Sequence, residues 1–290
     1  MGIGDDAAAV LPSGKNKLAL LTCDPVMEGI HFDSSATPFQ IGWKAMARNL
    51  SDIAAMGGVP LHALAAVSLP RRMTVSKALG IYRGLAAAAR KYGVSIVGGD
   101  TSRSPGGIYV VVMMMGEVAR HEIVTRSGAG MGDFVCVTGA LGGSIRGKHL
   151  RFNPRIHEAR FLARRRYPSA MLDLSDGLAG DLQQLAEQSG AGFEIWENAL
   201  PISSALCSRK LTREQRMEHA MRDGEDYELL FTVPSHRLGR LQAEWKKRFR
   251  LRLTPIGVVR SKRFGIQLVN KAGGHRKRSL PPPANDHFRG

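Results

Sequence analysis

The 290-residue sequence contains little that would place the protein in a membrane or among disulfide-bonded secreted proteins. Its three cysteines, Cys23, Cys136 and Cys207, form no Cys-X-X-Cys pair, so a reducing cytoplasm is the compartment that we expect. The longest apolar run, Ile108–Gly116, is about half as long as a membrane-spanning helix requires. The first residues show no basic segment followed by an apolar core, and therefore predict no secretory signal.

Positive charge is in excess, because 41 Lys and Arg residues against 25 Asp and Glu residues give a formal net charge of +16. Much of this charge falls in four segments, at residues 160–166, 246–252, 260–263 and 271–278. These segments contain few aromatic side chains, and no zinc-finger or RNA-recognition pattern accompanies them. We interpret them first as solvated basic surface and second as a means of attracting anionic small molecules. Specific nucleic-acid binding is the least favoured of the three interpretations.

Alternating strand and helix patterns predict an α/β fold with two domains, residues 1–120 and 121–290. In the first domain, strands are predicted at 17–24, 62–69, 95–99 and 107–118, and helices at 40–56 and 75–91. Because helices connect these strands, some of the strands should pair in parallel. In the second domain, strands are predicted at 134–138, 170–174, 193–196, 227–233, 254–259 and 265–269. A further helix should follow Ser175-Asp176-Gly177 and end at Gly190.

Aspartates stand at the ends of these predicted elements or in glycine-flanked turns. The set consists of Asp5, Asp6, Asp24, Asp52, Asp100, Asp173 and Asp176. Strand ends in α/β folds are common ligand sites, and acids that converge there need cations to balance their repulsion. Oxygen ligands without a His or Cys cluster favour Mg²⁺ or Ca²⁺ over zinc. Any one aspartate could instead cap a helix or a turn, but a purely structural role for the whole set is disfavoured.

The glycine-rich segments are less informative than the aspartates. Gly139–Gly143 follows a predicted strand and could hold a phosphate on its backbone N–H groups, or it could form an ordinary tight turn. The segment from Gly142 to Lys148 approximates a P-loop, but His149 stands where a Ser or Thr would bind Mg²⁺. We therefore reject a P-loop.

Two interpretations concern apolar positions in the predicted strands of the first domain. The three methionines at 113–115 lie in an apolar strand and are expected in the core. Cys23, between Thr22 and Asp24, is expected to be buried rather than reactive.

Seven segments occur in an order that is typical of one family. They read GIGDDAA at 2–8, EGIHF at 28–32, NLSDIAAMG at 49–57, GGDT at 98–101, TRSG at 125–128, DLSDGL at 173–178 and GEDYELLF at 224–231. Together they resemble the thiamine-monophosphate kinase family, within the aminoimidazole ribonucleotide synthetase-like superfamily. GDD or GGD alone would be shared across that superfamily, whereas the combination that ends in GEDYELLF favours the kinase branch.

The resemblance implies phosphorylation of thiamine monophosphate to thiamine diphosphate by direct in-line transfer from ATP, with several Mg²⁺ ions. It also implies an α/β (α+β) fold of two domains, with the N-terminal sheet used for homodimerisation. The expected partners are then ATP, thiamine monophosphate and a second copy of the chain. No membrane is expected, and nucleic acid is disfavoured.

By motif match the resemblance also implies roles for individual residues. Expected metal ligands are Asp6, Thr22, Cys23, Asp24, Asp52, Asp100, Asp173 and Asp176. Expected ATP contacts are Gly99, Asp100, Arg126 and Ser175, and expected substrate contacts are His31, Glu225 and Asn285. The expected catalytic set is Asp24, Asp52, Asp100, Arg126 and Asp173. Cys23 and Asn285 depart from the family pattern, which has a hydroxyl residue and an aromatic residue at these positions, and only the backbone carbonyl of Cys23 would suit Mg²⁺.

The implied chemistry agrees with a site that is rich in acids. A phosphate monoester has a second pKa of about 6, so the acceptor is already an anionic nucleophile at neutral pH and needs no general base. Two unit charges about 4 Å apart repel by roughly 4 kcal/mol at an effective dielectric constant of about 20, and metal ions would cancel this repulsion.

Two other readings stay open. One is an ATP-using enzyme of the same superfamily with a different acceptor. The other is a basic nucleic-acid or regulatory binding protein on a degenerate kinase scaffold, against which the intact Asp52, Asp100, Asp173 and Asp176 speak.

Overall fold

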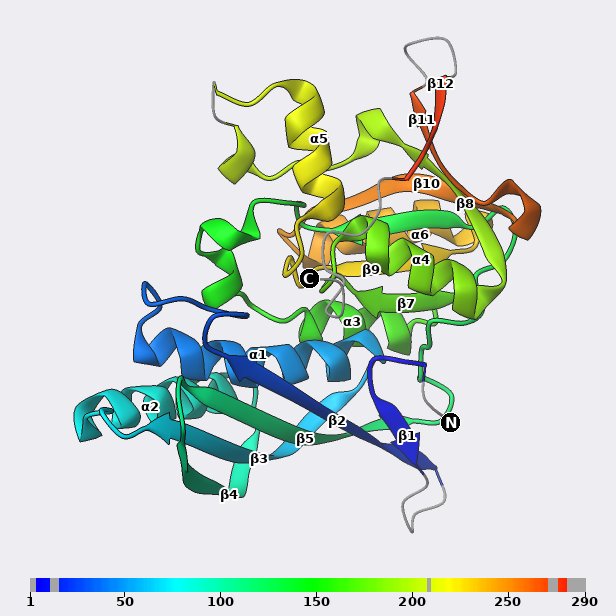
Figure 1. The fold of residues 1–290 in the computed structure, drawn as a ribbon. Helices are drawn as coiled ribbons and strands as arrows, with labels where there is room; N and C mark the ends of the chain where they lie inside the picture. Colours follow the sequence, from blue (N-terminus) through cyan, green and yellow to red (C-terminus); the bar gives the residue numbers. More distant parts are fainter. Residues whose placement is uncertain (1–3, 11–15, 208–209, 271–275, 281–290) are drawn as a thin grey trace. The chain divides into compact units, whose positions relative to one another are not determined.

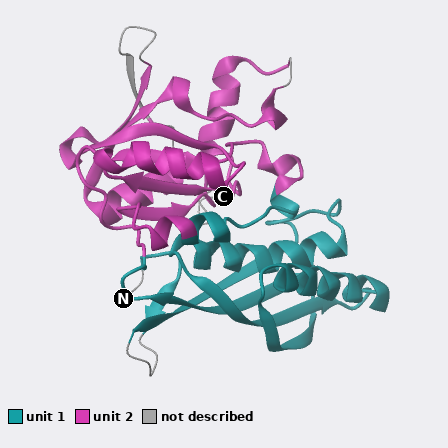
Figure 2. Cartoon of the chain, turned by 180° about the vertical axis from the view of Figure 1, so that it is seen from behind, with its two compact units in different colours: residues 1–123, 149–160 teal, residues 124–148, 161–290 magenta. Residues whose placement is uncertain are grey.

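The computed structural model describes residues 4–10, 16–207, 210–270 and 276–280. The chain divides into two compact units (Figure 2). Unit 1 comprises Met1–Ile123 and His149–Arg160, and unit 2 comprises Val124–Lys148 and Phe161–Gly290. A single boundary near residue 120 would assign residues 149–160 to the second half, but they belong to unit 1. None of the helices described is both long enough and apolar enough to span a membrane.

Unit 1 is built on a five-stranded sheet in the order β1-β2-β5-β3-β4. The strands are β1 (Ala8–Val10), β2 (Lys17–Met27), β3 (Val59–Pro70), β4 (Ser95–Ser104) and β5 (Tyr109–Ala119). Strands β3 and β4 pair in parallel, and the other neighbours are antiparallel. Helix α2 (Val75–Lys91) joins β3 to β4, as a parallel pair requires a crossover connection. The parallel pairing expected from the sequence is thus found in the β3–β4 pair.

Helices α1 (Pro38–Ala55) and α2 lie on the same side of this sheet (Figure 1). Helix α1 begins with a capping box in which the Thr37 hydroxyl accepts from the N–H of Gln40 and the Gln40 side chain accepts from the N–H of Thr37. The two helices cross in close contact. A Cβ on Gly42 would lie 2.0 Å from the carbonyl oxygen of Ile81, so only glycine permits this approach.

The two faces of the unit 1 sheet differ in what covers them. Side chains on the helix face, such as Leu20 and Met114, are fully buried. On the other face, Leu64 and Met113 remain 43% and 48% exposed and Met115 is also exposed. The expectation that all three methionines at 113–115 lie in the core is therefore wrong for two of them, because alternate residues of a strand point to opposite faces.

Unit 2 contains a seven-stranded sheet in the order β12-β11-β8-β10-β6-β9-β7. Its strands are β6 (Phe134–Thr138), β7 (Ala170–Asp173), β8 (Ala191–Trp196), β9 (Leu229–Val233), β10 (Leu253–Ser261), β11 (Ile266–Asn270) and β12 (Arg276–Ser279). Only β8 and β11 pair in parallel among the strand pairs described. The longer helices are α4 (Leu178–Ser189), α5 (Arg213–Arg222) and α6 (Ser235–Arg248), and α3 (Ile156–Arg164) carries the chain from unit 1 into unit 2.

The central strands of unit 2 are buried on both faces. On one face, Val137 and Leu230 belong to the same apolar cluster as Leu182 of α4. The opposite face carries Cys136 and Phe231, which are also fully buried, and α6 lies on that side of the sheet (Figure 1). No face of these strands is left open.

Two strands run further than the sequence predicts. Strand β2 continues to Met27 and β4 to Ser104, so Asp24 and Asp100 lie inside strands rather than at their ends. Strand β7, by contrast, ends at Asp173, one residue before its predicted end. The difference arises because pairing with β5 and β3 extends both strands past the polar residues that marked a predicted end.

Some elements were not predicted at all, namely β1, α3, α5, α6 and β12. Only the last residues of helix α6 were interpreted, as part of the basic segment 246–252. Its apolar residues Leu238, Leu241 and Trp245 follow helical spacing, but basic side chains separate them and mask the pattern.

Candidate active site

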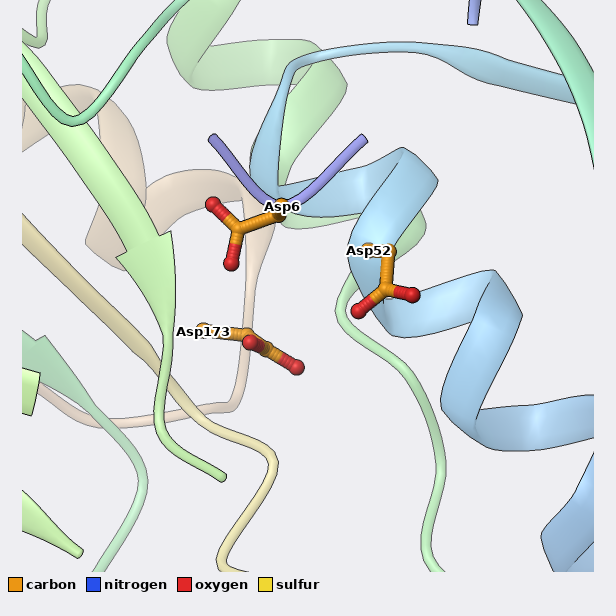
Figure 3. Close-up of side chains that lie close together, drawn as sticks. All are labelled: Asp6, Asp52 and Asp173. Carbon is orange, nitrogen blue, oxygen red and sulfur yellow. The ribbon is translucent and has the colours of Figure 1, made fainter. Parts of the chain in front are cut away.

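Two acids of unit 1 lie close together at the C-terminal end of α1. Asp52 is in the last turn of α1, and Asp6 is in the bend before β1. Carboxylate oxygens of the two residues lie within 4.8 Å of each other (Figure 3). The backbone N–H of Ala7 donates to the sulfur of Met56 at 3.2 Å, which holds the Asp6 segment against the end of α1. Sequence reasoning expected both acids at a metal, and the fold of unit 1 brings them together.

Two residues of β2 face the same helix. The Thr22 hydroxyl donates to the Asp52 carboxylate, and the Asp24 carboxylate forms an ion pair with Arg48 of α1 at 3.1 Å. Arg48 and Asp52 are four residues apart, so they share one face of α1. Sequence reasoning missed Arg48, although its helical spacing from Asp52 was the available signal.

Cys23 and Asp100 lie on the opposite face of the unit 1 sheet. Cys23 is exposed, contrary to expectation, because it alternates with the inward-facing Thr22. Partial burial and then the negative charge of Asp24 raise the pKa of the Cys23 thiol. Asp100 pairs with the exposed Ala66, and directly paired residues share a face. Within unit 1, neither residue joins Asp52.

Gly99 explains why β4 can carry Asp100 at this position. Its φ is +157°, and a Cβ there would lie 2.0 Å from the carbonyl oxygen of Ala65 in the neighbouring strand. Thr101 lies two residues after Gly99. It hydrogen-bonds to the hydroxyl of Tyr82 on α2 at 2.6 Å, which shows that Thr101 faces the helices. Asp100, between them, therefore faces away from the helices.

The donor set of unit 1 fits a hard divalent cation. Asp6, Asp24 and Asp52 offer carboxylate oxygens, and Thr22 offers a hydroxyl. Carboxylate oxygens of Asp6 and Asp52 lie within 4.8 Å of each other, so one cation could contact both residues. Oxygen donors without a His or Cys ligand suit Mg²⁺ better than zinc.

His31 lies in a turn that a buried lysine holds in place. The side chain of Lys44, in α1, is fully buried, and its ammonium donates to the His31 carbonyl oxygen at 2.5 Å. The Nδ1 atom of His31 accepts from the backbone N–H of Met27 at 3.1 Å, which fixes the ring within the turn. A buried lysine needs such an acceptor, because an uncompensated ammonium is costly away from water. Sequence reasoning missed Lys44, since a lysine inside an apolar helix gives no sign of its partner.

In unit 2, the loop between β7 and α4 carries Asp173, Ser175 and Asp176. Asp173 is buried at the end of β7 (also drawn in Figure 3). Asp176 does not cap α4, because Gly177 occupies the N-cap position and the Asp176 carboxylate accepts from Nε2 of Gln184 at 3.1 Å. The alternative interpretation of Asp176 as the N-cap of a helix is therefore wrong.

Gln184 links two residues that the motifs single out separately. Its Oε1 atom accepts from the guanidinium of Arg126, while its Nε2 atom donates to Asp176. Arg126 is thereby held toward the loop that precedes α4. The sequence alone gave no reason to select Gln184, since the residues that it joins are 50 positions apart in the chain.

In the glycine-rich loop after β6, four backbone N–H groups bond to the protein itself. The N–H groups of Gly139 and Leu141 donate to backbone carbonyl oxygens, each at 2.8 Å. Those of Gly142 and Gly143 donate to the carboxylates of Asp226 and Asp223, each at 2.7 Å. Backbone carbonyls and carboxylates of the protein itself thus occupy four of the donors that an anion would need.

Glu225, an expected substrate contact, has an unusual backbone. Its φ is +64°, in the left-handed region, and its N–H donates to the carbonyl oxygen of Ser175 at 2.7 Å. The expected substrate residue is thereby tied to an expected ATP residue within unit 2. Asn285 lies outside the described residues.

Comparisons with known proteins agree with these features. Residues 4–118 match the family model described as AIR synthase related protein, N-terminal domain. The thiamine-monophosphate kinase of Rhodopirellula baltica is 40% identical over 241 residues, which cover 80% of this chain and 76% of that protein. The enzyme of the same name from Bacillus subtilis is 35% identical over 285 residues, which cover 90% and 86%. The chain belongs to the thiamine-monophosphate kinase family.

A solved structure, AaThiL complexed with AMPPCP and TMP, has the same fold as the present chain. It has a TM-score of 0.80 at 34% identity and covers 96% of this chain and 92% of that chain. The mixed α/β fold and the family resemblance expected from the sequence are both confirmed.

Within the family framework, the expected site residues form three groups, apart from His31 in its turn and Gly99 in β4. Unit 1 gathers four of them on the helix face of its sheet: Asp6, Thr22, Asp24 and Asp52. Unit 2 gathers five along the β7–α4 loop and its neighbours: Arg126, Asp173, Ser175, Asp176 and Glu225. Asp100 and Cys23 lie on the open face of the unit 1 sheet.

Proposed function

We propose that this protein transfers the γ-phosphoryl group of ATP to thiamine monophosphate, forming thiamine diphosphate and ADP. The observation that carries the proposal is the pair Asp6 and Asp52, with Thr22 and Asp24 beside it, in a chain of the thiamine-monophosphate kinase family. The related AaThiL was solved with AMPPCP, an ATP analogue, and TMP. Both ligands agree with the proposed reaction.

Positioning and charge balance would supply the catalysis. The terminal phosphate of the acceptor is already a dianion for the most part at neutral pH, so no side chain needs to remove a proton from it. What opposes the reaction is the approach of two anionic phosphates. Arg126 would lower this barrier by placing its guanidinium against the phosphates of ATP.

We propose that Mg²⁺ binds the acids of the site. Asp6, Thr22, Asp24 and Asp52 are the residues of unit 1 that would bind it, and Asp173 and Asp176 are the acids of unit 2 that would bind Mg²⁺. The ion would supply positive charge that draws the acceptor and donor phosphates together. The residues would keep it in place, because their carboxylates repel one another without it.

The open face of the unit 1 sheet supports a homodimer. Leu64, Met113 and Met115 present apolar side chains there, and an exposed apolar sheet face of this kind marks an interaction surface. A second copy of the chain would cover this face. Asp100 lies on the same face, so we propose that ATP binds near the dimer interface with Gly99 and Asp100 beside it. The free thiols of Cys23, Cys136 and Cys207 agree with a reducing cytoplasm.

The test is ADP release from ATP and Mg²⁺, measured with thiamine monophosphate, with other phosphate monoesters and with no acceptor. We expect turnover that depends on both thiamine monophosphate and Mg²⁺, with thiamine diphosphate found by chromatography. Turnover that prefers another acceptor would replace the proposed substrate. Absence of nucleotide binding and turnover would contradict the proposed enzyme activity.

A further inference from the structure

Three carboxylates of the segment 223–228 bind one loop of unit 2. Asp223 accepts from the N–H of Gly143 and Asp226 from the N–H of Gly142, each at 2.7 Å. Glu228 accepts from Oγ1 of Thr138 at 2.9 Å and from the ammonium of Lys148 at 3.0 Å. The Ser144 hydroxyl adds a second donor to Asp226. The three acids thus bind the segment 138–148 from end to end.

Two of these acids are out of reach of a substrate. The side chains of Asp226 and Glu228 belong to residues that are each only 1% exposed. A buried carboxylate is costly unless it accepts hydrogen bonds on both oxygens, and each of these two does so. Burial raises the pKa of Asp226 to about 6, which reflects the cost of keeping it charged there. Their role must therefore be exerted through neighbouring residues.

The backbone between these acids is strained. Glu225 and Tyr227, on either side of Asp226, have φ values of +64° and +49°. The left-handed region costs a residue with a side chain roughly 1–2 kcal/mol, so surrounding contacts must impose it. Such strain is often found where a side chain has to be aimed at a ligand.

The strained segment is fixed on two sides. On one side, the N–H groups of Glu225 and Tyr227 donate to the carbonyl oxygens of Ser175 and Leu174, at 2.7 and 2.8 Å. On the other side, the Asp226 carboxylate is fixed by the loop at Gly142. If the hydrogen bonds of Asp226 are removed, the conformational energy of the left-handed region favours relaxation of Glu225 into the right-handed region. This relaxation would change the direction of the Glu225 side chain.

We propose that Asp226 is a positioning residue for substrate: by binding the loop at Gly142 and Ser144, it holds Glu225 in the left-handed conformation that presents Glu225 to thiamine monophosphate. The inference rests on the proposed function, because it assumes that Glu225 contacts this substrate. It assigns to Asp226 no contact with substrate or with the reacting atoms.

The test compares Asp226→Ala with a matched control, Asp133→Ala. Asp133 is also a buried acid of unit 2, and it accepts from one backbone N–H, that of Gly130 at 2.9 Å, and from one hydroxyl, that of Ser169 at 2.5 Å. Both variants should lose thermal stability. Only Asp226→Ala should raise the KM for thiamine monophosphate, by about ten-fold or more, with a smaller change in kcat and in the KM for ATP. Isothermal titration should show the same loss of thiamine monophosphate affinity.

Two milder variants keep the test decisive if Asp226→Ala does not fold. In Asp226→Asn, the amide oxygen can accept from Gly142 and the amide N–H can donate to the Ser144 hydroxyl, so the KM should stay within about three-fold of wild type. Ser144→Ala removes one donor and should raise the KM by roughly three-fold.

Equal KM values in Asp226→Ala and Asp133→Ala, in an enzyme whose wild type uses thiamine monophosphate, would overturn this inference alone. A KM in Asp226→Asn as high as in the alanine variant would also contradict it. Failure of the wild type to use thiamine monophosphate would overturn the proposed function, and this inference with it.

Discussion

The two sheets of the molecule differ in how completely the chain covers them. In unit 2, the central strands are buried on both faces, with Val137 toward α4 and Phe231 on the opposite side. In unit 1, helices cover one face only, and Met113 lies exposed on the other. Strands of similar apolar character are therefore buried on both faces in unit 2, whereas in unit 1 one face of the sheet stays exposed. The exposed apolar face of unit 1 agrees with the proposed homodimer.

The acids of the two units differ in the same way. In unit 2, Asp226 and Glu228 are buried and bonded to donors of the protein itself. In unit 1, Asp6 and Asp52 are half-buried, their carboxylate oxygens lie within 4.8 Å of each other, and Asp52 also accepts from the Thr22 hydroxyl. The buried acids of unit 2 hold the backbone of a loop, whereas the acids of unit 1 are the ones for which we propose a cation. Burial and partner type, rather than residue type, distinguish the two groups.

The largest effect on the contrast between the acids of the two units is expected from the substitution Asp52→Asn. It removes one charge from the unit 1 acids and should lower kcat by on the order of 1,000-fold, because charge balance between the phosphates is lost. Folding without metal should be no weaker than in wild type, because a repulsion is relieved. ADP release and thermal melting measure the two effects. The control is Asp33→Asn, an exposed acid that accepts from Ser35 and should leave both unchanged.

A second test concerns the open face of the unit 1 sheet. Met113→Lys places a charge in the middle of that face and should weaken dimerisation by at least about 100-fold, because burial of an unpaired ammonium is costly. Sedimentation over a range of protein concentrations measures this effect. Met131→Lys is the matched control, since Met131 is 80% exposed in a loop of unit 2. A wild-type chain that stays monomeric at high concentration would contradict the proposed interface.

A third test sharpens the account of the unit 2 acids. Glu228→Gln removes the charge that pairs with Lys148 and should lower the free energy of unfolding by about 2 kcal/mol. Glu218→Gln breaks the exposed pair with Arg222 and should cost less than about 0.5 kcal/mol. Urea denaturation of the two variants gives the comparison. Equal losses would mean that the buried network contributes no more than a surface ion pair.

The last test concerns a pH dependence of stability that comes from Asp226. Burial raises the pKa of Asp226 from 3.8 to about 6; the charge of Lys148 acts against this shift and that of Glu228 adds to it. The folded state therefore binds the proton more tightly than the unfolded state. The stability that this tighter proton binding contributes is complete below pH about 4, and it is lost as the pH rises through about 6.

The free energy of unfolding of the wild type should thus fall, relative to that of Asp226→Asn, between pH 4 and 7. The change should be roughly 1.4 kcal/mol for each unit of difference in pKa. Urea denaturation of both proteins across this range measures it. A difference that stays constant with pH would show that Asp226 titrates alike in the folded and unfolded chain.

Much of the fold could be predicted from periodicity and turn residues. The bounds of α2 and β6 agree with prediction, and Gly190 ends α4 as expected. Helix α6 was missed because basic residues interrupt its apolar stripe, and the ends of β2 and β4 were misplaced because pairing partners decide how far a strand runs. Element type is a local property, whereas strand length is not.

The candidate site was predicted only as a set of residues. The motifs singled out Asp6 and Asp52, which unit 1 brings together, but they placed Asp100 in the same group. The face on which Asp100 lies depends on its pairing with Ala66, and no local pattern specifies that register. Residues that hold others in place, such as Lys44 and Gln184, carry no sequence signal because their partners are distant in the chain.

The central claim is that the acids of unit 1 bind a cation together with nucleotide. The most direct test is thermal melting of the wild type and of Asp52→Asn, each with and without Mg²⁺ and AMPPCP. A ligand that binds only the folded state raises its stability by mass action, so the wild-type Tm should rise by several degrees and that of Asp52→Asn should stay nearly constant. The same rise in both proteins, or no rise in the wild type, would contradict the account.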